Sequence, residues 1–287
     1  MLNLERIRAL PPLQVPVAYS RKDVALYALS IGMGAPRDAE LAYVFDEKLK
    51  CTPMFAMVLA HQLPWLRDPE NGIDVRRMLH GESSLEVHHP LPAACAVVVH
   101  GRITQVVDCG PGKSVSIYFE QRILQSDDGQ HMATVGGCFV FPGAGVEATA
   151  GTDRPARAPS IPDGIADAEE TVQVPANAAQ LYRLNGDRNT LHVDPEVAHR
   201  AGFPKPILHG LCTLGYAGAA AIRTVCEGDA DRIVRIRARY ASPIYPGERL
   251  RTLFYRAGHG AYGFRCVAED RNVTVLDAGE LALREPQ

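Results

Sequence analysis

Asp187, Asn189 and His192 place a carboxylate, an amide and an imidazole on one short stretch of chain. A carboxylate can take a proton from water, and an imidazole can accept or donate one near neutral pH. Asn189 can orient either partner, and Gly186 suits a sharp exit from a preceding helix. Together these groups can hold a water molecule and deliver H and OH across a double bond, or remove them. The alternative is a simple turn, with Asn189 as its cap and His192 as an ordinary half-buried histidine.

A second candidate is Gly210, which follows His209 and begins a segment of small apolar residues that runs to about Thr224. This segment predicts a buried helix, because it is apolar nearly all round. The first backbone N–H groups of a helix have no partner inside it, and the helix dipole is positive there. Gly210 can therefore donate to a developing oxyanion, a contribution of about 3 to 4 kcal/mol in a transition state. The alternative is a glycine that serves only close packing.

Arginines and histidines elsewhere give weaker indications. Five arginines on two neighbouring predicted strands form either a phosphate-binding row or a solvated sheet face: Arg235, Arg237, Arg239, Arg249 and Arg251. A group of histidines lies in the first half of the chain: His80, His88, His89 and His100. Because no Cys or Glu accompanies them at a recognised ligand spacing, we expect no metal site.

The elements that must position these residues recur in the two halves of the chain. Residues 26–32 continue a helical pattern that begins after Ser20, a predicted N-cap. Residues 181–186 end a similar helix in the second half. A further matched pair is Leu79-His80-Gly81 and Leu208-His209-Gly210. These matches indicate a duplicated domain.

Strand-like patterns follow in both halves, at residues 97–99, 115–119 and 134–141 and then at 233–240, 249–256, 263–268 and 272–283. Proline and glycine recur between Pro142 and Pro175, which is typical of a linker. We therefore predict one repeat at residues 1–150 and a second at 175–287, joined by a linker at 151–174.

Composition limits the class of protein. The 287 residues are 46% hydrophobic and 22% charged, as in an ordinary globular protein. The net charge of −3 gives no general reason to bind nucleic acid or an anionic membrane. Seven dispersed cysteines without a Cys-x-x-Cys pair argue against a disulfide framework. With no signal-peptide core, membrane-length apolar stretch or peroxisomal C-terminal signal, we expect a cytoplasmic protein.

Residues 181–215 resemble the hydratase 2 motif of the MaoC-like family, the (R)-specific enoyl-CoA hydratases. The family pattern, approximately Leu-Tyr-Arg-Leu-Ser-Gly-Asp-x-Asn-Pro-Leu-His-x-Asp-Pro, is matched by residues 181–195. Its continuation, Ala-Gly-Phe-x-x-Pro-Ile-Leu-His-Gly-Leu-Cys-Thr, is matched by residues 201–213. The first half is similar at 19–21, 27–29, 79–82 and 90–92, so the resemblance covers most of both halves.

The resemblance implies an α+β double hot-dog fold, in which each repeat has a long central helix wrapped by an antiparallel sheet. It implies reversible hydration of trans-2-enoyl-CoA to (3R)-3-hydroxyacyl-CoA in fatty acid metabolism. No cofactor is expected beyond the CoA of the substrate, and we expect a homodimer. The alternatives are a dehydratase of acyl-carrier-protein or specialised CoA thioesters, a hot-dog acyl-CoA thioesterase and a non-catalytic acyl-CoA binder.

Roles for particular residues also follow from the resemblance. Asp187 and His192 would hold the catalytic water with help from Asn189, and Gly210 would bind the thioester carbonyl. The assignment of acid and base within the pair stays open, because a shared water couples them. The acyl-CoA contacts of the family carry over to His80, Gly81 and Tyr240.

Three positions differ from the family pattern. Thr190 stands where the family usually has proline, which removes rigidity from the loop. Cys109 stands where some relatives have a lysine that contacts CoA, a role that Lys113 can take. The first repeat has Gly32-Met33-Gly34 in place of the catalytic loop. By resemblance, the first repeat is therefore non-catalytic and accommodates the acyl chain.

Overall fold

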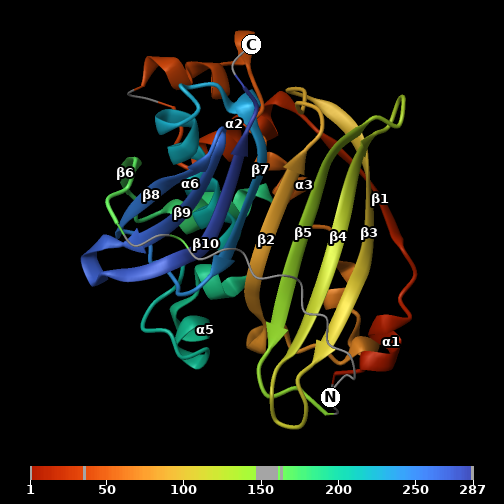
Figure 1. Ribbon diagram of the computed structural model, residues 1–287. Helices are drawn as coiled ribbons and strands as arrows, with labels where there is room; N and C mark the ends of the chain where they lie inside the picture. The colour runs from red at the N-terminus through yellow and green to blue at the C-terminus, as the bar shows by residue number, and fades with distance from the viewer. Residues whose placement is uncertain (1, 35–36, 147–160, 162–163, 286–287) are drawn as a thin grey trace.

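The computed structural model describes residues 2–34, 37–146, 161 and 164–285. Its strands form one antiparallel sheet of ten (Figure 1). The strands are β1 (Leu13–Tyr19), β2 (Leu79–Val87), β3 (Cys95–Asp108), β4 (Val115–Gln125), β5 (His131–Phe141), β6 (Ala168–Gln173), β7 (Ile233–Tyr240), β8 (Arg249–Gly258), β9 (Ala261–Ala268) and β10 (Val273–Leu283). The predicted strands are confirmed, and the structure adds β1, β2 and β6.

The helices are shorter and lie beside this sheet. The α-helices are α1 (Leu4–Arg8), α2 (Arg21–Ser30), α3 (Phe55–Leu59), α4 (Ala178–Tyr182), α5 (Pro195–Arg200) and α6 (Gly210–Thr224). The short 3₁₀ helices are η1 (Asp38–Tyr43), η2 (Asp46–Lys48), η3 (Pro64–Leu66), η4 (Pro69–Asn71), η5 (Val75–Arg77), η6 (Arg183–Asn185), η7 (Thr190–His192), η8 (Ala230–Arg232) and η9 (Glu269–Arg271).

The order of the strands shows the duplication directly. It runs β1-β3-β4-β5-β2-β7-β10-β9-β8-β6, so the second half repeats the first in reverse order from the centre outward. The halves meet where β2 pairs with β7, from Glu82 opposite Arg239 to Glu86 opposite Arg235. This arrangement confirms the predicted α+β double hot-dog fold. One hydrophobic core includes buried residues of both halves.

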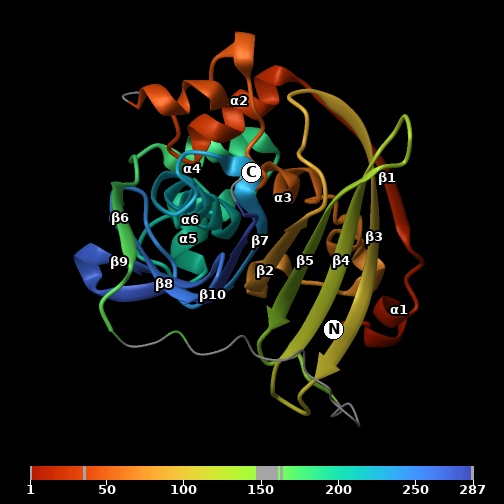
Figure 2. The same cartoon turned by 45° about the horizontal axis from the view of Figure 1, so that its top comes forward.

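Helix α6 is the long central helix of the second half. Figure 2 shows it beside α4 and α5, on one side of β7–β10. Its glycines allow close contact with the first half, because a Cβ on Gly215 would lie 2.5 Å from Cγ2 of Ile31 and one on Gly218 would lie 2.5 Å from Cε of Met54. The described part of the first half has no helix of this length: α2 has 10 residues and α3 has five. The expectation of a long helix in each repeat was therefore wrong for the first.

The ends of α2 and of the α4–η6 segment meet across the two halves. Nδ2 of Asn185 donates to Oγ of Ser30 at 3.0 Å. Three residues earlier in each segment, the rings of Tyr27 and Tyr182 lie 6.2 Å apart. The predicted correspondence of these segments is thus confirmed. Ser20 caps α2 as predicted, with its backbone N–H donating to Asp23 at 2.8 Å.

Two other expectations need correction. His80-Gly81 lies in β2, whereas His209-Gly210 lies at the start of α6, so this pair does not occupy equivalent places. Residues 168–173 of the predicted linker form β6, which pairs with β8 at the edge of the sheet. The sequence Ala-Glu-Glu-Thr-Val-Gln has polar alternation that gives an edge strand little apolar signal. Much of the remaining linker, including 151–160, lies outside the described residues.

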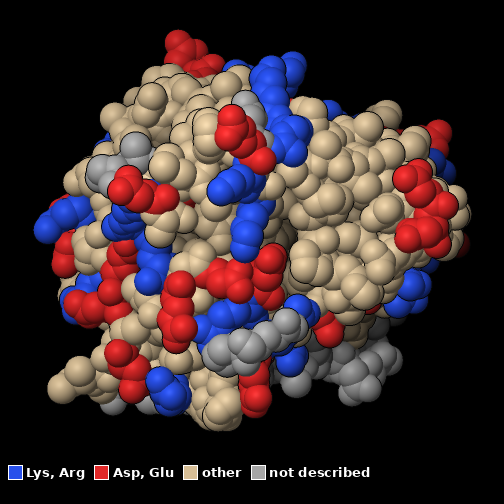
Figure 3. All heavy atoms as spheres, turned by 90° about the horizontal axis from the view of Figure 1, so that it is seen from above, with Lys and Arg blue, Asp and Glu red and all other residues tan. Residues whose placement is uncertain are grey.

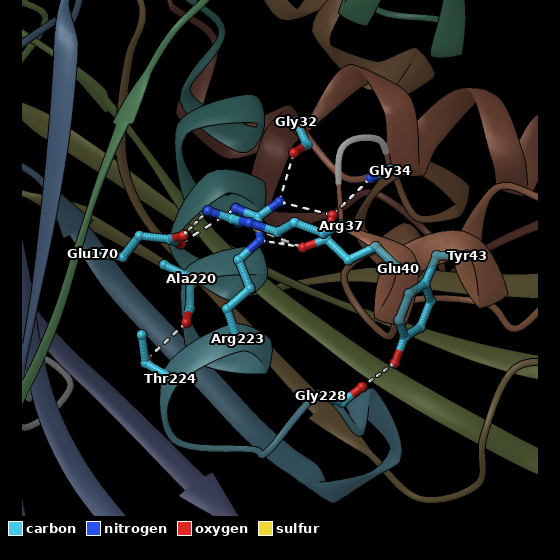
Figure 4. Close-up of polar contacts among 10 residues, drawn as sticks. All are labelled: Gly32, Gly34, Arg37, Glu40, Tyr43, Glu170, Ala220, Arg223, Thr224 and Gly228. Atoms are coloured by element: carbon cyan, nitrogen blue, oxygen red, sulfur yellow. Dashed lines mark hydrogen bonds and ion pairs between the residues drawn. The ribbon is translucent and has the colours of Figure 1, made fainter.

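A buried ion cluster joins the last turn of α6 to the first half (Figure 4). The guanidinium of Arg223 binds the carboxylate of Glu40, donates to the carbonyl oxygen of Gly32 at 2.6 Å and lies 3.2 Å from Glu170 of β6. Glu40 also accepts from the backbone N–H of Gly34 at 2.7 Å. The Arg223 and Glu40 side chains are only 9% and 4% exposed, so the loop after α2 is tied firmly to α6.

The surface carries charges of both signs side by side. Figure 3 shows basic and acidic side chains interspersed on the face seen from above. All seven cysteines are free. Within the described ranges, no helix has the length and apolar character needed to cross a membrane.

Candidate active site

The loop that carries the predicted catalytic groups begins at Gly186, which has a left-handed conformation with φ of 119°. A side chain would be strained there, so glycine allows the chain to leave η6 sharply. Asp187 follows, and its Oδ1 accepts from the backbone N–H of Asn189 at 3.1 Å. The Asn189 side chain accepts from the N–H of Leu191 at 3.1 Å and so caps η7. These bonds fix the carboxylate relative to His192, the last residue of η7.

The ring of His192 has a defined orientation. Its Nδ1 lies 2.9 Å from the carbonyl oxygen of Ile207, which can only accept, so Nδ1 carries the proton and Nε2 is left as an acceptor. The ring is 8% exposed, and burial lowers its pKa, although the nearby Asp187 acts in the opposite direction. His192 is therefore a neutral base at neutral pH.

Asp187 and His192 are close enough to share one water molecule. Side-chain nitrogen or oxygen atoms of Asp187, His192 and His209 lie within 4.8 Å of one another. A water molecule that makes two ordinary hydrogen bonds, of about 2.8 Å each, can bridge such a separation. The geometry thus permits one water molecule to contact an acid and a base at the same time.

Three histidines influence the charge of Asp187. Burial alone raises the pKa of this carboxyl, but His61, His209 and His192, together with the N–H of Asn189, lower it below its ordinary value. His61 belongs to the first half, after α3, and its Nε2 lies 4.0 Å from Oδ2 of Asp187. Asp187 is therefore a carboxylate at neutral pH, despite being only 24% exposed.

His209 supports the same loop from the start of α6. Its ring stacks on that of His192 with centroids 3.7 Å apart, and its Nε2 donates to the backbone carbonyl of Asp187 at 3.2 Å. The residue is 1% exposed, and burial lowers its pKa to about 3. His209 therefore acts as a neutral support for the catalytic loop.

Gly210 is the first residue of α6, as predicted, and the side chain of His209 does not cap the helix. The first N–H groups of α6 thus remain available to a ligand. A Cβ on Gly210 would lie 2.9 Å from Cε1 of Tyr240, so glycine is required for the close contact with β7. Tyr240 donates from its hydroxyl to Oγ of Ser83 at 3.1 Å, and Oγ lies 3.0 Å from Nε2 of His80. This chain of bonds joins β7 to β2 beside Gly210.

Two cavities lead from this region into the first half. The smaller is about 10 Å³, close to the minimum for one water molecule, and its lining includes His61, His80 and Leu211. The larger is about 260 Å³ and mostly apolar, with Trp65 among its lining residues. Both are lined by Leu63, Phe119 and Gln121, so they adjoin.

The carboxylate and imidazoles are poorly arranged for a metal ion. A metal ligand set needs lone pairs that converge on one point. The His192 and His209 rings instead stack at an interplanar angle of 27°, which keeps their nitrogen lone pairs in two nearly parallel planes. Nδ1 of His192 and Nε2 of His209 are also used in bonds to backbone carbonyls. Asp187, His192 and His209 are therefore better arranged to position a water molecule than to coordinate a metal ion.

Comparisons with known proteins agree with this geometry. Residues 158–277 match the MaoC like domain family, and residues 17–141 match the MFE-2 hydratase 2 N-terminal domain family. The chain is 34% identical over 252 residues to 3-hydroxyacyl-thioester dehydratase Y of Mycobacterium tuberculosis, covering 86% of this chain and 85% of the relative. The chain belongs to the MaoC-like hydratase 2 family.

Other members of the MaoC-like hydratase 2 family show the same relation. The peroxisomal enoyl-CoA hydratase 2 of Arabidopsis thaliana is 32% identical, with 93% of this chain and 90% of that protein covered. The peroxisomal multifunctional enzyme type 2 of Mus musculus is 30% identical over 91% of this chain, which spans 36% of that protein. The crystal structure of a MaoC-like dehydratase from Phytophthora capsici superposes with a TM-score of 0.87 at 28% identity, over 99% and 98% of the two chains.

The structure brings together most of the predicted site residues. Asp187, His192, Gly210, Tyr240 and His80 gather near the start of α6. Gly81 differs: it lies at an irregularity between β2 and β5, where a Cβ would lie 3.0 Å from Val140 Cγ2 and 3.2 Å from the Cys138 carbonyl oxygen. Packing of the sheet explains that glycine, and its predicted acyl-CoA contact stays a prediction.

The predicted phosphate row is largely occupied by acidic partners. Arg237 lies 3.4 Å from Glu82, and Arg239 lies 3.1 Å from Asp277. On β8, Arg249 and Arg251 form ion pairs with Asp270 and with Glu169. These pairs favour the solvated sheet face over the phosphate site. Cys109 and Lys113 lie in the turn between β3 and β4, and their predicted relation to CoA stays a prediction.

Sequence reasoning missed His61, Ser83 and the role of His209. His209 is part of the quoted Leu-His-Gly motif, so its place at a helix start could have indicated a support for the loop. His61 and Ser83 belong to no recognised pattern and are separated from Asp187 by more than a hundred positions. Only the folded chain brings them to the site.

Proposed function

We propose that this protein catalyses the reversible hydration of trans-2-enoyl-CoA to (3R)-3-hydroxyacyl-CoA in fatty acid metabolism. The observation that carries the proposal is the approach of Asp187 and His192 to within the reach of one water molecule. Gly210 adds unpaired N–H groups at the start of α6. The names of the relatives, enoyl-CoA hydratase 2 and 3-hydroxyacyl-thioester dehydratase, support the same chemistry.

The proposed reaction uses these groups together. In hydration, the water oxygen bonds to C3 of the enoyl group while one of its protons passes to the Asp187–His192 pair. The electrons of the C2–C3 double bond move toward the thioester, and C2 takes a proton from the pair. Negative charge develops on the thioester oxygen, where the N–H of Gly210 stabilises it. Dehydration follows the same steps in reverse, and no other reactant is needed.

The acyl chain is proposed to enter the first half. The apolar cavity of about 260 Å³ adjoins the small cavity beside His80 and Leu211, next to Gly210. A medium to long chain would remove apolar surface of both partners from water. His80 and Tyr240 would border the thioester, whereas the first half supplies no catalytic acid of its own.

Replacement of the catalytic pair tests the proposed function. Asp187→Asn and His192→Gln should each lower kcat for hydration of a medium-chain enoyl-CoA by about a hundred- to ten-thousand-fold, because each removes a general acid or base. The loss of enoyl absorbance measures the rate, and circular dichroism checks the fold. His259→Ala is the matched control, because this ring is 83% exposed. Wild-type rates in both site variants, or an S product on chiral analysis, would contradict the assignment.

Parallel assays separate the rival substrates and reactions. An enoyl thioester of acyl-carrier protein should react more slowly than the CoA ester. A thiol reagent should detect no free CoA, whereas release of CoA would indicate a thioesterase. We propose that the reaction needs no cofactor, so dialysis against EDTA should leave kcat unchanged.

We also propose that the protein is cytoplasmic and forms a homodimer. The seven free cysteines are those of a protein kept in a reducing environment. Cell fractionation tests the location, and a peroxisomal fraction would contradict it, as some relatives carry peroxisomal names. Analytical ultracentrifugation tests the dimer, for which one chain of 31.2 kDa gives the monomer mass.

A further inference from the structure

His61 connects the first half of the chain to the catalytic loop of the second. It follows α3, and its side chain is 32% exposed. Its Nε2 lies 4.0 Å from Oδ2 of Asp187, while Oδ1 of the same carboxylate is bound by the N–H of Asn189. The two oxygens of Asp187 therefore face different halves of the molecule.

The duplication places His61 at a meaningful position. It lies six residues after the start of α3 (61 − 55 = 6), as Tyr216 lies six residues after the start of α6 (216 − 210 = 6). Tyr216 contacts the loop of the first half, because a Cβ on Gly32 would lie 2.6 Å from its Cε1. Gly32 and Asp187 each stand two residues beyond the preceding helical segment (32 − 30 = 2; 187 − 185 = 2). Each half thus sends one ring to the other half's loop. His61 meets the carboxylate of Asp187, whereas Tyr216 meets a glycine and the nearby Glu40 is bound by Arg223.

The chemistry of the two contacts differs accordingly. Tyr216 fills the space beside a glycine and holds the non-catalytic loop by packing. His61 faces a carboxylate that is largely removed from water and costs free energy to ionise without a compensating charge. An imidazole nitrogen can donate a hydrogen bond toward a carboxylate oxygen, directly or through water, and so compensates for that loss of hydration.

We propose that His61 is a positioning residue, which pairs with Oδ2 of Asp187 and keeps this carboxylate ionised and directed toward the water site. The expected change in kinetics rests on the proposed function, whereas the pairing of His61 with Asp187 does not. The other titratable groups that face Asp187 are His192 of η7 and His209 before α6, with His80 of β2 beyond His61. Burial lowers the pKa of His192 and of His209, whereas the side chain of His61 is 32% exposed at the edge of the site.

The kinetic test compares His61→Ala, His61→Gln and His61→Lys with the His259→Ala control. Removal of the imidazole should raise the pKa of Asp187, because His61 is the neighbour that lowers it most. The acid limb of kcat/KM should therefore move to higher pH in His61→Ala and His61→Gln. The loss of kcat should grow as the pH falls and should stay well below the loss caused by removal of a general acid or base. His61→Lys should keep the wild-type acid limb.

A spectroscopic test separates this inference from the proposed function. In protein labelled with ¹³C at the aspartate carboxyl carbon, the signal of Asp187 is the one missing from Asp187→Asn. This signal should titrate at a higher pH in His61→Gln than in the wild type. In His259→Ala it should titrate at the same pH as in the wild type. An unchanged titration, or an unchanged acid limb in His61→Gln, would overturn the role of His61. If the wild type were inactive and the Asp187 signal still titrated at a higher pH in His61→Gln, only the proposed function would be overturned.

Discussion

At the scale of single residues, the site works because most of its histidines are kept neutral. The His80 ring lies between Phe139 and Tyr240, at centroid distances of 5.0 and 4.6 Å. Burial there lowers its pKa to about 3, with a smaller contribution from His61. Neutral rings can accept hydrogen bonds: Nε2 of His80 lies 3.0 Å from Oγ of Ser83, and Nε2 of His192 can accept from water. One carboxylate therefore remains the main fixed charge of the site.

The same neutral histidines predict loss of stability in acid. The folded pKa of His80 lies below the ordinary value of 6.5, so between pH 6.5 and about 3 the unfolded chain binds more protons than the folded chain. The free energy of unfolding should therefore decrease as pH falls from 7.5 to 5, as measured by urea denaturation. His80→Gln should weaken this dependence, because the unfolded chain then has no imidazole at this position to take up a proton. An equal pH dependence in wild type and His80→Gln would contradict this explanation.

At the scale of elements, the sequence predicted best where one pattern decides the structure. The alternation of residues 233–240 gave β7 with its observed bounds, and the apolar run after His209 gave α6. The prediction failed at β6, a polar edge strand that is stabilised by pairing with β8 rather than by its own pattern. The expectation of a long helix in the first half was also wrong, because it came from the family resemblance and not from an apolar run of that half, in which α3 has five residues.

The ion pair between Arg223 and Glu40 holds the C-terminal end of helix α6 against the first half. Replacement of Arg223 should therefore lower the stability of the fold strongly. Arg223→Met leaves the buried Glu40 without its main partner and should lower the free energy of unfolding by about 3 to 5 kcal/mol. The double variant Glu40→Gln/Arg223→Met removes both charges, and its free energy of unfolding should fall much less than that of Arg223→Met. Urea denaturation at pH 7.5 measures both.

An exposed ion pair provides the control for this cluster. Arg102 lies 3.1 Å from Glu120 on the sheet surface, and its side chain is 62% exposed. Arg102→Met should change the free energy of unfolding by less than about 1 kcal/mol. If Arg223→Met changed the free energy of unfolding as little as Arg102→Met, the buried ion cluster would not be what stabilises the position of α6.

At the scale of the whole molecule, the proposed reaction divides its work between two similar halves. The second half supplies Asp187, His192 and Gly210, and the first supplies His61, His80 and the apolar cavity. The catalytic loop was predictable because its groups lie close together in sequence. The cross-half partners were not, since their approach depends on the β2–β7 pairing and on how α3 meets the loop. A site shared in this way needs both halves folded together.

That dependence predicts a single unfolding transition. The only tryptophan, Trp65, lies in the first half against Phe119 and Phe139, so its fluorescence reports that half. Hydratase activity reports the catalytic loop of the second. Trp65 packs against a separate core cluster of the first half, but β2 pairs with β7 and the larger core cluster contains residues of both halves. Both signals should therefore be lost at the same urea concentration. Loss of activity at a clearly lower concentration than the Trp65 signal would show instead that the halves unfold independently and that the shared sheet does not couple them.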